Sequence, residues 1–188
     1  MIEIVPYQAG WPLEFLQIAA ALRQALGELA LRIDHIGSTS VPGLAAKDVI
    51  DIQITVRALT PEIQSALEAI GYTRSEKIDH DHRPAHGAEA ENEWKKWFFN
   101  PPEGQRRTNT HMRIAGRANQ HYALLFRDYL RSHPATAESY AELKCRLAQH
   151  LADPETYPEV KDPAVDLIYL AAEDWAALTG WQPGQSDA

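Results

Sequence analysis

A change in hydrophobic periodicity near residue 118 constrains the fold of this chain more than any other feature of its sequence. Before this point, residues 31–36 and 49–56 alternate apolar and polar side chains, which is typical of half-buried strands. After it, apolar residues recur at helical spacing in three stretches, at residues 122–130, 140–151 and 165–175. This order predicts an α+β fold in which helices cover a small central sheet and the C-terminal part is mainly helical.

Local signals predict the remaining elements. An alanine- and leucine-rich stretch at residues 12–30 indicates a helix, and the run Thr60–Glu62 is typical of the start of another. Shorter strands are expected at residues 72–75, 94–99 and 108–114. The pair Asp162-Pro163 is expected to begin the final helix, because proline suits the first helical turn.

The length of 188 residues fits one domain of ordinary size. A globular chain of this length buries roughly 70% of its unfolded surface, which is enough for a core of its own. We therefore expect a single domain over residues 1–188, with residues 184–188 as a flexible tail.

The charges are unevenly distributed along the chain. The formal net charge of −8 disfavours long nucleic acid and anionic membranes as partners. Residues 94–131 nevertheless form a basic stretch. Its basic side chains are Lys95, Lys96, Arg106, Arg107, Arg113, Arg117, Arg127 and Arg131. We therefore expect a small phosphate-bearing ligand, bound by part of this stretch.

Cysteine usage and hydropathy indicate the compartment. Cys145 is the only cysteine, so no disulfide can form within the chain, which is typical of a reducing environment. The first residues lack the basic and apolar pattern of a secretion signal, and no run of about 18 apolar residues occurs. We expect a cytoplasmic protein with no membrane partner.

A Gly-Ser turn between the two alternating segments carries the clearest chemical signal. Gly37 lets the backbone approach a ligand closely, and the hydroxyls of Ser38 and Ser40, with free backbone N–H groups, suit an anionic phosphate. On the next strand, Asp51 and Gln53 share the polar face. A carboxylate beside such a turn is what Mg²⁺-assisted phosphoryl or nucleotidyl transfer requires.

The motif from Gly37 to Lys47, continued by residues 49–52, resembles the signature of the GrpB-like family, a branch of the nucleotidyltransferase-fold superfamily. The resemblance covers nearly the whole chain. Its further motifs are residues 71–72, 110–113 and 125–134, together with Tyr140, Leu143, Lys144, Tyr157 and Lys161. The resemblance implies a nucleotidyltransferase-like mixed sheet flanked by helices and, in some relatives, fusion to a dephospho-coenzyme A kinase domain.

The same resemblance implies roles for individual residues. Gly37 and Ser38 would hold the phosphates of a nucleotide or another small phosphorylated molecule, and Ser40 and Lys47 would assist them. Asp51 would be the Mg²⁺ ligand and a catalytic residue. The implied activity is nucleotidyl transfer to an acceptor that the sequence does not identify.

This chain departs from the superfamily pattern at the metal site. Active nucleotidyltransferases carry two carboxylates in Asp-x-Asp spacing and a third from a neighbouring strand, whereas here the pair reads Asp51-Ile52-Gln53. The neighbouring strand at residues 108–114 contains no carboxylate. Single-metal nucleotidyl transfer and ligand binding without catalysis therefore both remain open.

Cationic and histidine side chains would complete the polar wall of the site. Arg113, on that neighbouring strand, and Arg127, in the following helix, are candidate phosphate ligands. His111 is a candidate catalytic residue for proton transfer, or a ligand for a softer divalent metal. These three residues lie within the basic stretch of residues 94–131.

The segment from Asp79 to Glu93 groups three histidines with several acids. Its side chains would suit a transition metal, but their spacing matches no structural zinc pattern. A solvated acidic surface loop is therefore favoured. A third hypothesis makes the loop a lid whose negative charge excludes unwanted anions.

Overall fold

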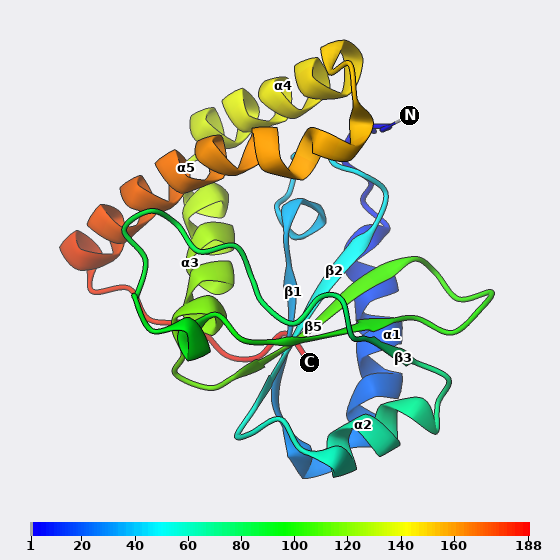
Figure 1. The fold of residues 1–188 in the computed structure, drawn as a ribbon. Coiled ribbons are helices and arrows are strands. Elements are labelled where there is room, and N and C mark those ends of the chain that lie inside the picture. Colours follow the sequence, from blue (N-terminus) through cyan, green and yellow to red (C-terminus); the bar gives the residue numbers. More distant parts are fainter. Residues whose placement is uncertain (1) are drawn as a thin grey trace.

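A five-stranded mixed sheet forms the centre of the computed structural model, which describes residues 2–188 (Figure 1). Its strands are β1 (Ala30–Ile36), β2 (Ile50–Val56), β3 (Thr73–Ser75), β4 (Trp97–Asn100) and β5 (Thr108–Ile114). Their spatial order is β1-β2-β5-β4-β3, and among these five strands the β2–β5 pair is parallel while the other pairs are antiparallel. The predicted small mixed sheet is confirmed.

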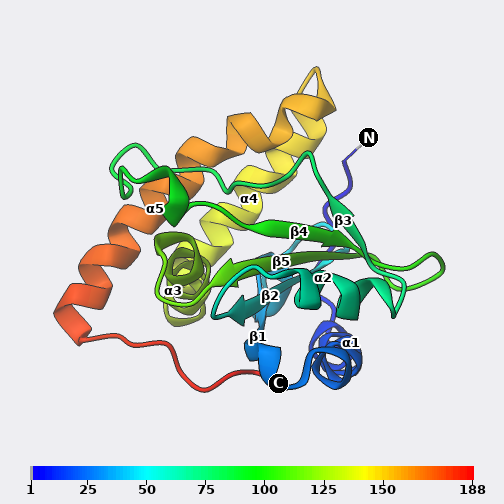
Figure 2. The same ribbon diagram turned by 60° about the horizontal axis from the view of Figure 1, so that its bottom comes forward.

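Five α-helices within residues 2–188 flank this sheet. They are α1 (Trp11–Leu26), α2 (Pro61–Glu68), α3 (Ala118–Ser132), α4 (Pro134–His150) and α5 (Tyr157–Thr179). Helices α1 and α2 cover one face, while α3 lies on the other and packs against α4 and α5 (Figure 2). The predicted helical C-terminal part is confirmed. None of the helices described between residues 2 and 188 is long and apolar enough to cross a membrane.

Strand β2 is buried on both of its faces. Ile50, Ile52 and Ile54 are fully buried in the core beneath α1 and α2. On the opposite, polar face, Gln53 and Thr55 are also buried. This face is largely covered because β2 is a central strand that pairs in parallel with β5 and lies under α3, and of its polar residues only Asp51 is partly exposed. The buried Gln53 therefore needs partners inside the protein.

Helix α5 begins earlier than the sequence indicated. It starts at Tyr157, so Pro163 lies inside the helix rather than at its first turn. The nearer start signal is Pro158, the second residue of α5, because proline fits the first turn of a helix. The longer helix places Tyr157 and Lys161 beside α4 and facing the sheet.

The expectation of a flexible tail at residues 184–188 is wrong. The Ala188 amide donates to the Ile33 carbonyl at 3.1 Å, and the His35 amide donates to Asp187 Oδ2 at 2.9 Å. Ser186 Oγ accepts from the Ile33 amide at 2.9 Å. Strand β1 is an edge strand with unpaired backbone groups, and this segment satisfies them (Figure 2).

Candidate functional site

The Gly-Ser turn lies directly against β2 because Gly37 has no side chain. Gly37 has φ of 68°, and a Cβ atom at this position would stand 2.3 Å from Asp51 Oδ2. Both the backbone conformation and the space therefore require glycine. The turn continues as a short 3₁₀ helix at Ser38–Ser40, which brings Ser38 to the rim of a cavity.

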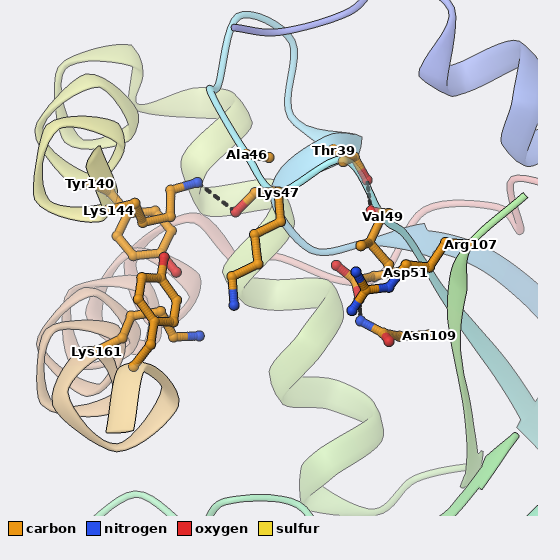
Figure 3. A pocket seen from close by; sticks show the side chains of 12 residues that line it. Thr39, Ala46, Lys47, Val49, Asp51, Arg107, Asn109, Tyr140, Lys144 and Lys161 are labelled. Carbon is orange, nitrogen blue, oxygen red and sulfur yellow. Dashed lines mark hydrogen bonds between the residues drawn. The ribbon is translucent and has the colours of Figure 1, made fainter. Parts of the chain in front are cut away.

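This first cavity, of about 250 Å³, lies between the Gly-Ser turn, the first residues of β2 and β5, and helices α4 and α5 (Figure 3). Its charged lining residues are Lys47, Arg107, Lys144, Lys161 and Asp51. The side chains of Lys47, Lys161 and Arg107 point toward the same space (Figure 3). Four cationic side chains thus surround one carboxylate, which is an electrostatic arrangement suited to an anion.

Lys144 is the most deeply buried of these cations, with 3% of its surface exposed. Its Nζ donates to Ser38 Oγ at 2.8 Å and to the Ala45 carbonyl at 2.5 Å. Burial and then the charge of Lys161 lower the pKa of Lys144 to about 7. Burial also lowers the pKa of Lys47, with further contributions from Lys161 and Arg107. Cations that lower one another's pKa mark a place where a bound anion would be stabilising.

Asp51 is the single acidic residue lining the first cavity. Its Oδ1 accepts a hydrogen bond from Asn109 Nδ2 at 2.7 Å, and the two residues are register partners in the parallel β2–β5 pair. Burial raises the pKa of Asp51, although the hydrogen bond from Asn109 and the charge of Lys161 oppose this effect. Asp51 therefore lies among cations but has no direct ion pair with any of them in the described residues.

Gln53, which replaces the second carboxylate of the expected motif, has a structural role. Its Nε2 donates to the Gln120 carbonyl at 3.1 Å, and its Oε1 accepts from Arg113 Nη1 at 2.6 Å. A glutamine offers both a donor and an acceptor, so it satisfies α3 and β5 at once, whereas a carboxylate would have no donor for α3. Both polar ends of Gln53 are thus occupied.

A buried charge cluster lies next to the first cavity. Asp81 accepts hydrogen bonds from Lys96 Nζ at 2.6 Å, Arg113 Nε and Nη2 at 2.8 Å each, and Asn119 Nδ2 at 3.0 Å. Burial would raise the pKa of Asp81, but the charges of Arg113 and Lys96 outweigh it and hold the pKa well below its usual range. Arg113 is therefore already paired with a protein carboxylate.

His111 adjoins this cluster as a neutral imidazole. Lys96 Nζ donates to its Nδ1 at 3.2 Å. Burial, followed by the charges of Arg113 and Lys96, lowers the pKa of His111 well below its ordinary value. The ring therefore carries its proton on Nε2 and can donate one hydrogen bond there.

The acidic and histidine-rich loop is largely exposed, but several of its side chains face the fold. Asp81 enters the charge cluster, and His82 Nε2 donates to Asp166 of α5 at 3.0 Å. The loop passes across α3 and α5 (Figure 1). Among residues 2–188, no group of three or more histidine, cysteine, aspartate or glutamate side chains is placed to hold a metal ion.

The structure brings most of the predicted site residues together. Ser38, Lys47 and Asp51 line the first cavity. Gly37, His111 and Arg113 line a second cavity of about 260 Å³. Ser38 and Asp51 belong to both, so the two cavities adjoin.

Two predicted phosphate ligands lie elsewhere. Ser40 Oγ donates to the Gly37 carbonyl at 2.6 Å, and Ser40 lines a hollow on the side of α1. Arg127 lies outside both cavities, because it donates to the His35 carbonyl at 3.1 Å and to Asp187 at 2.8 Å. The prediction that Ser40 and Arg127 hold phosphate is not supported by this geometry, since the turn and the C-terminal segment occupy their polar groups.

Sequence reasoning missed Lys144 and Lys161 as cations of the first cavity. The basic stretch at residues 94–131 contributes one cation, Arg107, to that cavity, and α4 and α5 supply the two missed lysines. The sequence did contain a signal for them, because Lys144 and Lys161 are both among the residues by which the chain resembles the GrpB-like family. Asp81 was likewise assigned to a solvated loop and lies instead in the charge cluster.

The mixed sheet, the Gly-Ser turn and the facing aspartate define a nucleotidyltransferase-like fold. A structure titled Cid1 in complex with its short product ApU shares this fold with a TM-score of 0.52. The match covers 77% of this chain and 43% of that chain at 13% identity.

The chain belongs to the GrpB family, because its residues 1–170 match the family model described as GrpB protein. The crystal structure of the conserved protein GrpB from Enterococcus faecalis is similar with a TM-score of 0.71 and 31% identity. That match covers 92% of this chain and 99% of the other.

The chain is also similar to curated proteins that are longer than it is. A dephospho-CoA kinase of Mycolicibacterium paratuberculosis is 39% identical over 97% of this chain and 48% of its own length. A protein of Pseudomonas aeruginosa, UPF0157 protein PA4798, is 37% identical over 89% of this chain and 66% of its own. The chain thus spans about half the length of the kinase-named relative, whose activity belongs to that longer protein.

Proposed function

We propose that this protein binds a nucleotide or another small phosphorylated molecule, with the phosphates in the first cavity. The observation that carries the proposal is the convergence of Lys47, Arg107, Lys144 and Lys161 beside the Ser38 hydroxyl. Their charge exceeds that of Asp51, so a phosphate would relieve the repulsion between the cations. The acidic remainder of the chain disfavours long nucleic acid as the ligand.

The cationic residues have different parts in this binding. Lys47 and Lys161 are partly exposed and Arg107 is exposed, and these three side chains supply charge-assisted hydrogen bonds to phosphate oxygens. Lys144 donates hydrogen bonds to the Ala45 carbonyl and to Ser38 Oγ, so it positions the serine hydroxyl and adds positive charge beside it.

The donor set fits one Mg²⁺ ion that arrives with the phosphates. Mg²⁺ is commonly held by one or two carboxylates together with substrate phosphates, and Asp51 supplies one such carboxylate. A pair of resident ions does not fit, because Gln53 is bonded at both ends. When bound, the ion would neutralise phosphate charge and orient the phosphate chain.

The same donor set favours binding over nucleotidyl transfer. Transfer usually relies on several acidic ligands around the metal, whereas the first cavity holds a single acid among four cations. We therefore propose a ligand-binding function as the primary one. Transfer would require an acceptor hydroxyl to attack the α-phosphorus while pyrophosphate leaves, and pyrophosphate release from a bound triphosphate would establish it.

Substitution of Asp51 by asparagine tests the metal together with the ligand. We expect calorimetric titration of the wild type with nucleoside triphosphates and dephospho-coenzyme A to show tighter binding with Mg²⁺ than with EDTA. In Asp51→Asn the gain from Mg²⁺ is expected to disappear, because the one carboxylate for the ion is lost. Metal-free affinity should be equal to or higher than that of the wild type.

Two other outcomes would contradict these statements. Mg²⁺-dependent binding that survives in Asp51→Asn would remove Asp51 as the metal ligand. Absence of binding to every phosphorylated probe, in a wild-type protein that unfolds cooperatively, would overturn the proposed function itself.

The pKa of Lys144 predicts a pH dependence of anion binding. Because burial and Lys161 lower this pKa to about 7, the protonated form dominates only below pH 7. Protonated Lys144 attracts an anion, so affinity falls as the pH rises through this range. With inorganic sulfate, whose charge is constant, we expect roughly a fivefold or greater loss of affinity between about pH 7.5 and 8.5.

The control for this prediction is Lys144→Met, which keeps the length of the side chain. This variant should bind sulfate more weakly than the wild type and with little pH dependence over the same range. A wild-type affinity that is flat with pH would show that Lys144 is not the titrating cation of the site.

A further inference from the structure

The second cavity has one apolar wall and one polar wall. Its apolar residues are Ile36, Tyr122, Ala123, Phe126 and Val165. The rings of Tyr122 and Phe126 lie one turn apart on α3 with planes within 4° of each other and centroids 6.4 Å apart. Tyr140, which also lines the cavity, packs edge-on against Phe126, so this wall offers aromatic rings against which a planar group can pack.

The polar wall has no excess of positive charge. The charged residues that line the cavity are three acids and two cations, namely Asp51, Asp81, Asp162, Arg113 and Lys161. Arg113 is already bonded to Asp81, and His111 is an uncharged imidazole. A second phosphate would have to compete with Asp81 for Arg113. This cavity therefore suits an uncharged group, in contrast to the cationic first cavity.

Asn119 leaves an unsatisfied acceptor at this wall. Its Nδ2 donates to Asp81 Oδ2 at 3.0 Å and to the Lys95 carbonyl at 3.1 Å, which fixes the orientation of the amide. Its Oδ1 is buried and has no hydrogen-bond partner among the described residues. Buried acceptors without partners are rare, and a small shift on ligand binding would let an N–H donor reach this oxygen.

We propose that the second cavity binds a planar, uncharged aromatic group with N–H donors, of the kind a nucleobase provides. Ser38, Asp51, Tyr140 and Lys161 line both cavities, so one molecule can place its phosphates in the first and its ring in the second. This inference rests on the proposed function and narrows its ligand to a nucleotide, as opposed to a sugar phosphate or an inorganic polyphosphate.

The test fills the second cavity without removing any interaction. Ala123 is half-buried on α3 and lines this cavity, so Ala123→Leu places extra bulk inside it. Ala148→Leu is the matched control, because Ala148 is also half-buried, on α4, and lines a separate hollow near the N-terminal segment. Both variants and the wild type are titrated calorimetrically with ATP, UTP and inorganic tripolyphosphate.

The wild type is expected to bind at least one nucleoside triphosphate about tenfold or more tightly than tripolyphosphate. Ala123→Leu should remove this preference while leaving tripolyphosphate affinity unchanged, and Ala148→Leu should behave as the wild type.

Three results would overturn the inference, and they are distinguishable from one another. If the wild type binds tripolyphosphate as tightly as both nucleotides, the ring contributes nothing and the inference fails, while the proposed function stands. Equal loss for all three ligands in a folded Ala123→Leu also contradicts it. If the wild type binds none of them, the proposed function fails as well. Should Ala123→Leu not fold, the wild-type comparison alone decides.

Discussion

Replacement of Gly37 by alanine is expected to destabilise the protein by about 3–5 kcal/mol and to abolish phosphate binding. The new methyl group would stand 2.3 Å from Asp51 Oδ2, and the backbone has a φ of 68° that side chains rarely adopt. Relief of the contact requires the Gly-Ser turn to move away from β2, which would displace Ser38 from the first cavity. Urea denaturation and calorimetric titration measure the two effects.

The matched control is Gly43→Ala in the same connection between β1 and β2. Gly43 also has a positive φ, of 80°, but its added methyl group would meet no atom within 4 Å. We expect this variant to lose only about 1 kcal/mol and to keep its ligand affinity. Equal losses in the two variants would show that backbone strain alone, rather than the close approach to Asp51, makes Gly37 necessary.

Removal of the Asp81 carboxylate is expected to cost about 3–5 kcal/mol, because Asp81→Ala leaves two buried cations without a counter-charge. Lys96 and Arg113 both bond to this side chain, and each of these cations is largely buried. Asp79→Ala is the control, since Asp79 lies in the same loop with its side chain 56% exposed. If both variants lost the same unfolding free energy, the bonds of Asp81 to Lys96 and Arg113 would not be what stabilises the protein here.

The same cluster predicts how stability changes with acid. Arg113 and Lys96 overcome the effect of burial and hold the folded-state pKa of Asp81 below its unfolded value, which is about 3.9. The stabilisation is therefore complete above about pH 4 and is lost as the pH falls below it. The gap in unfolding free energy between the wild type and Asp81→Asn should narrow from about pH 4 downward.

Local patterns were sufficient for the elements of the sheet and for the Gly-Ser turn, because periodicity and glycine conformation depend on neighbouring residues. Local patterns did not predict the structure correctly where the same residues were compatible with two conformations. The pair Asp162-Pro163 resembles a helix start, yet α5 begins at Tyr157, since Pro158 provides an earlier one. Likewise, a polar C-terminal segment resembles a free tail until an unpaired edge strand is present to bind it.

The distribution of charge along the chain predicted only part of the site correctly. It indicated the basic stretch at residues 94–131 as the ligand-binding region, but there Arg113 pairs with Asp81 and Arg127 pairs with Asp187. These ion pairs join segments that are far apart in the sequence, so the spacing of the residues does not predict them. Three of the four cations that surround the first cavity, Lys47, Lys144 and Lys161, come from other parts of the chain.

The amino-acid sequence by itself determined the α+β class, the glycine-dependent turn, the position of Asp51 and the absence of a second acid at Gln53. These properties are local, since each depends on the order of side chains within a few residues. Only the tertiary structure decided which cations meet that turn. Lys144 lies 106 residues from Ser38, and the packing of α4 and α5 against the sheet brings their lysines to the cavity.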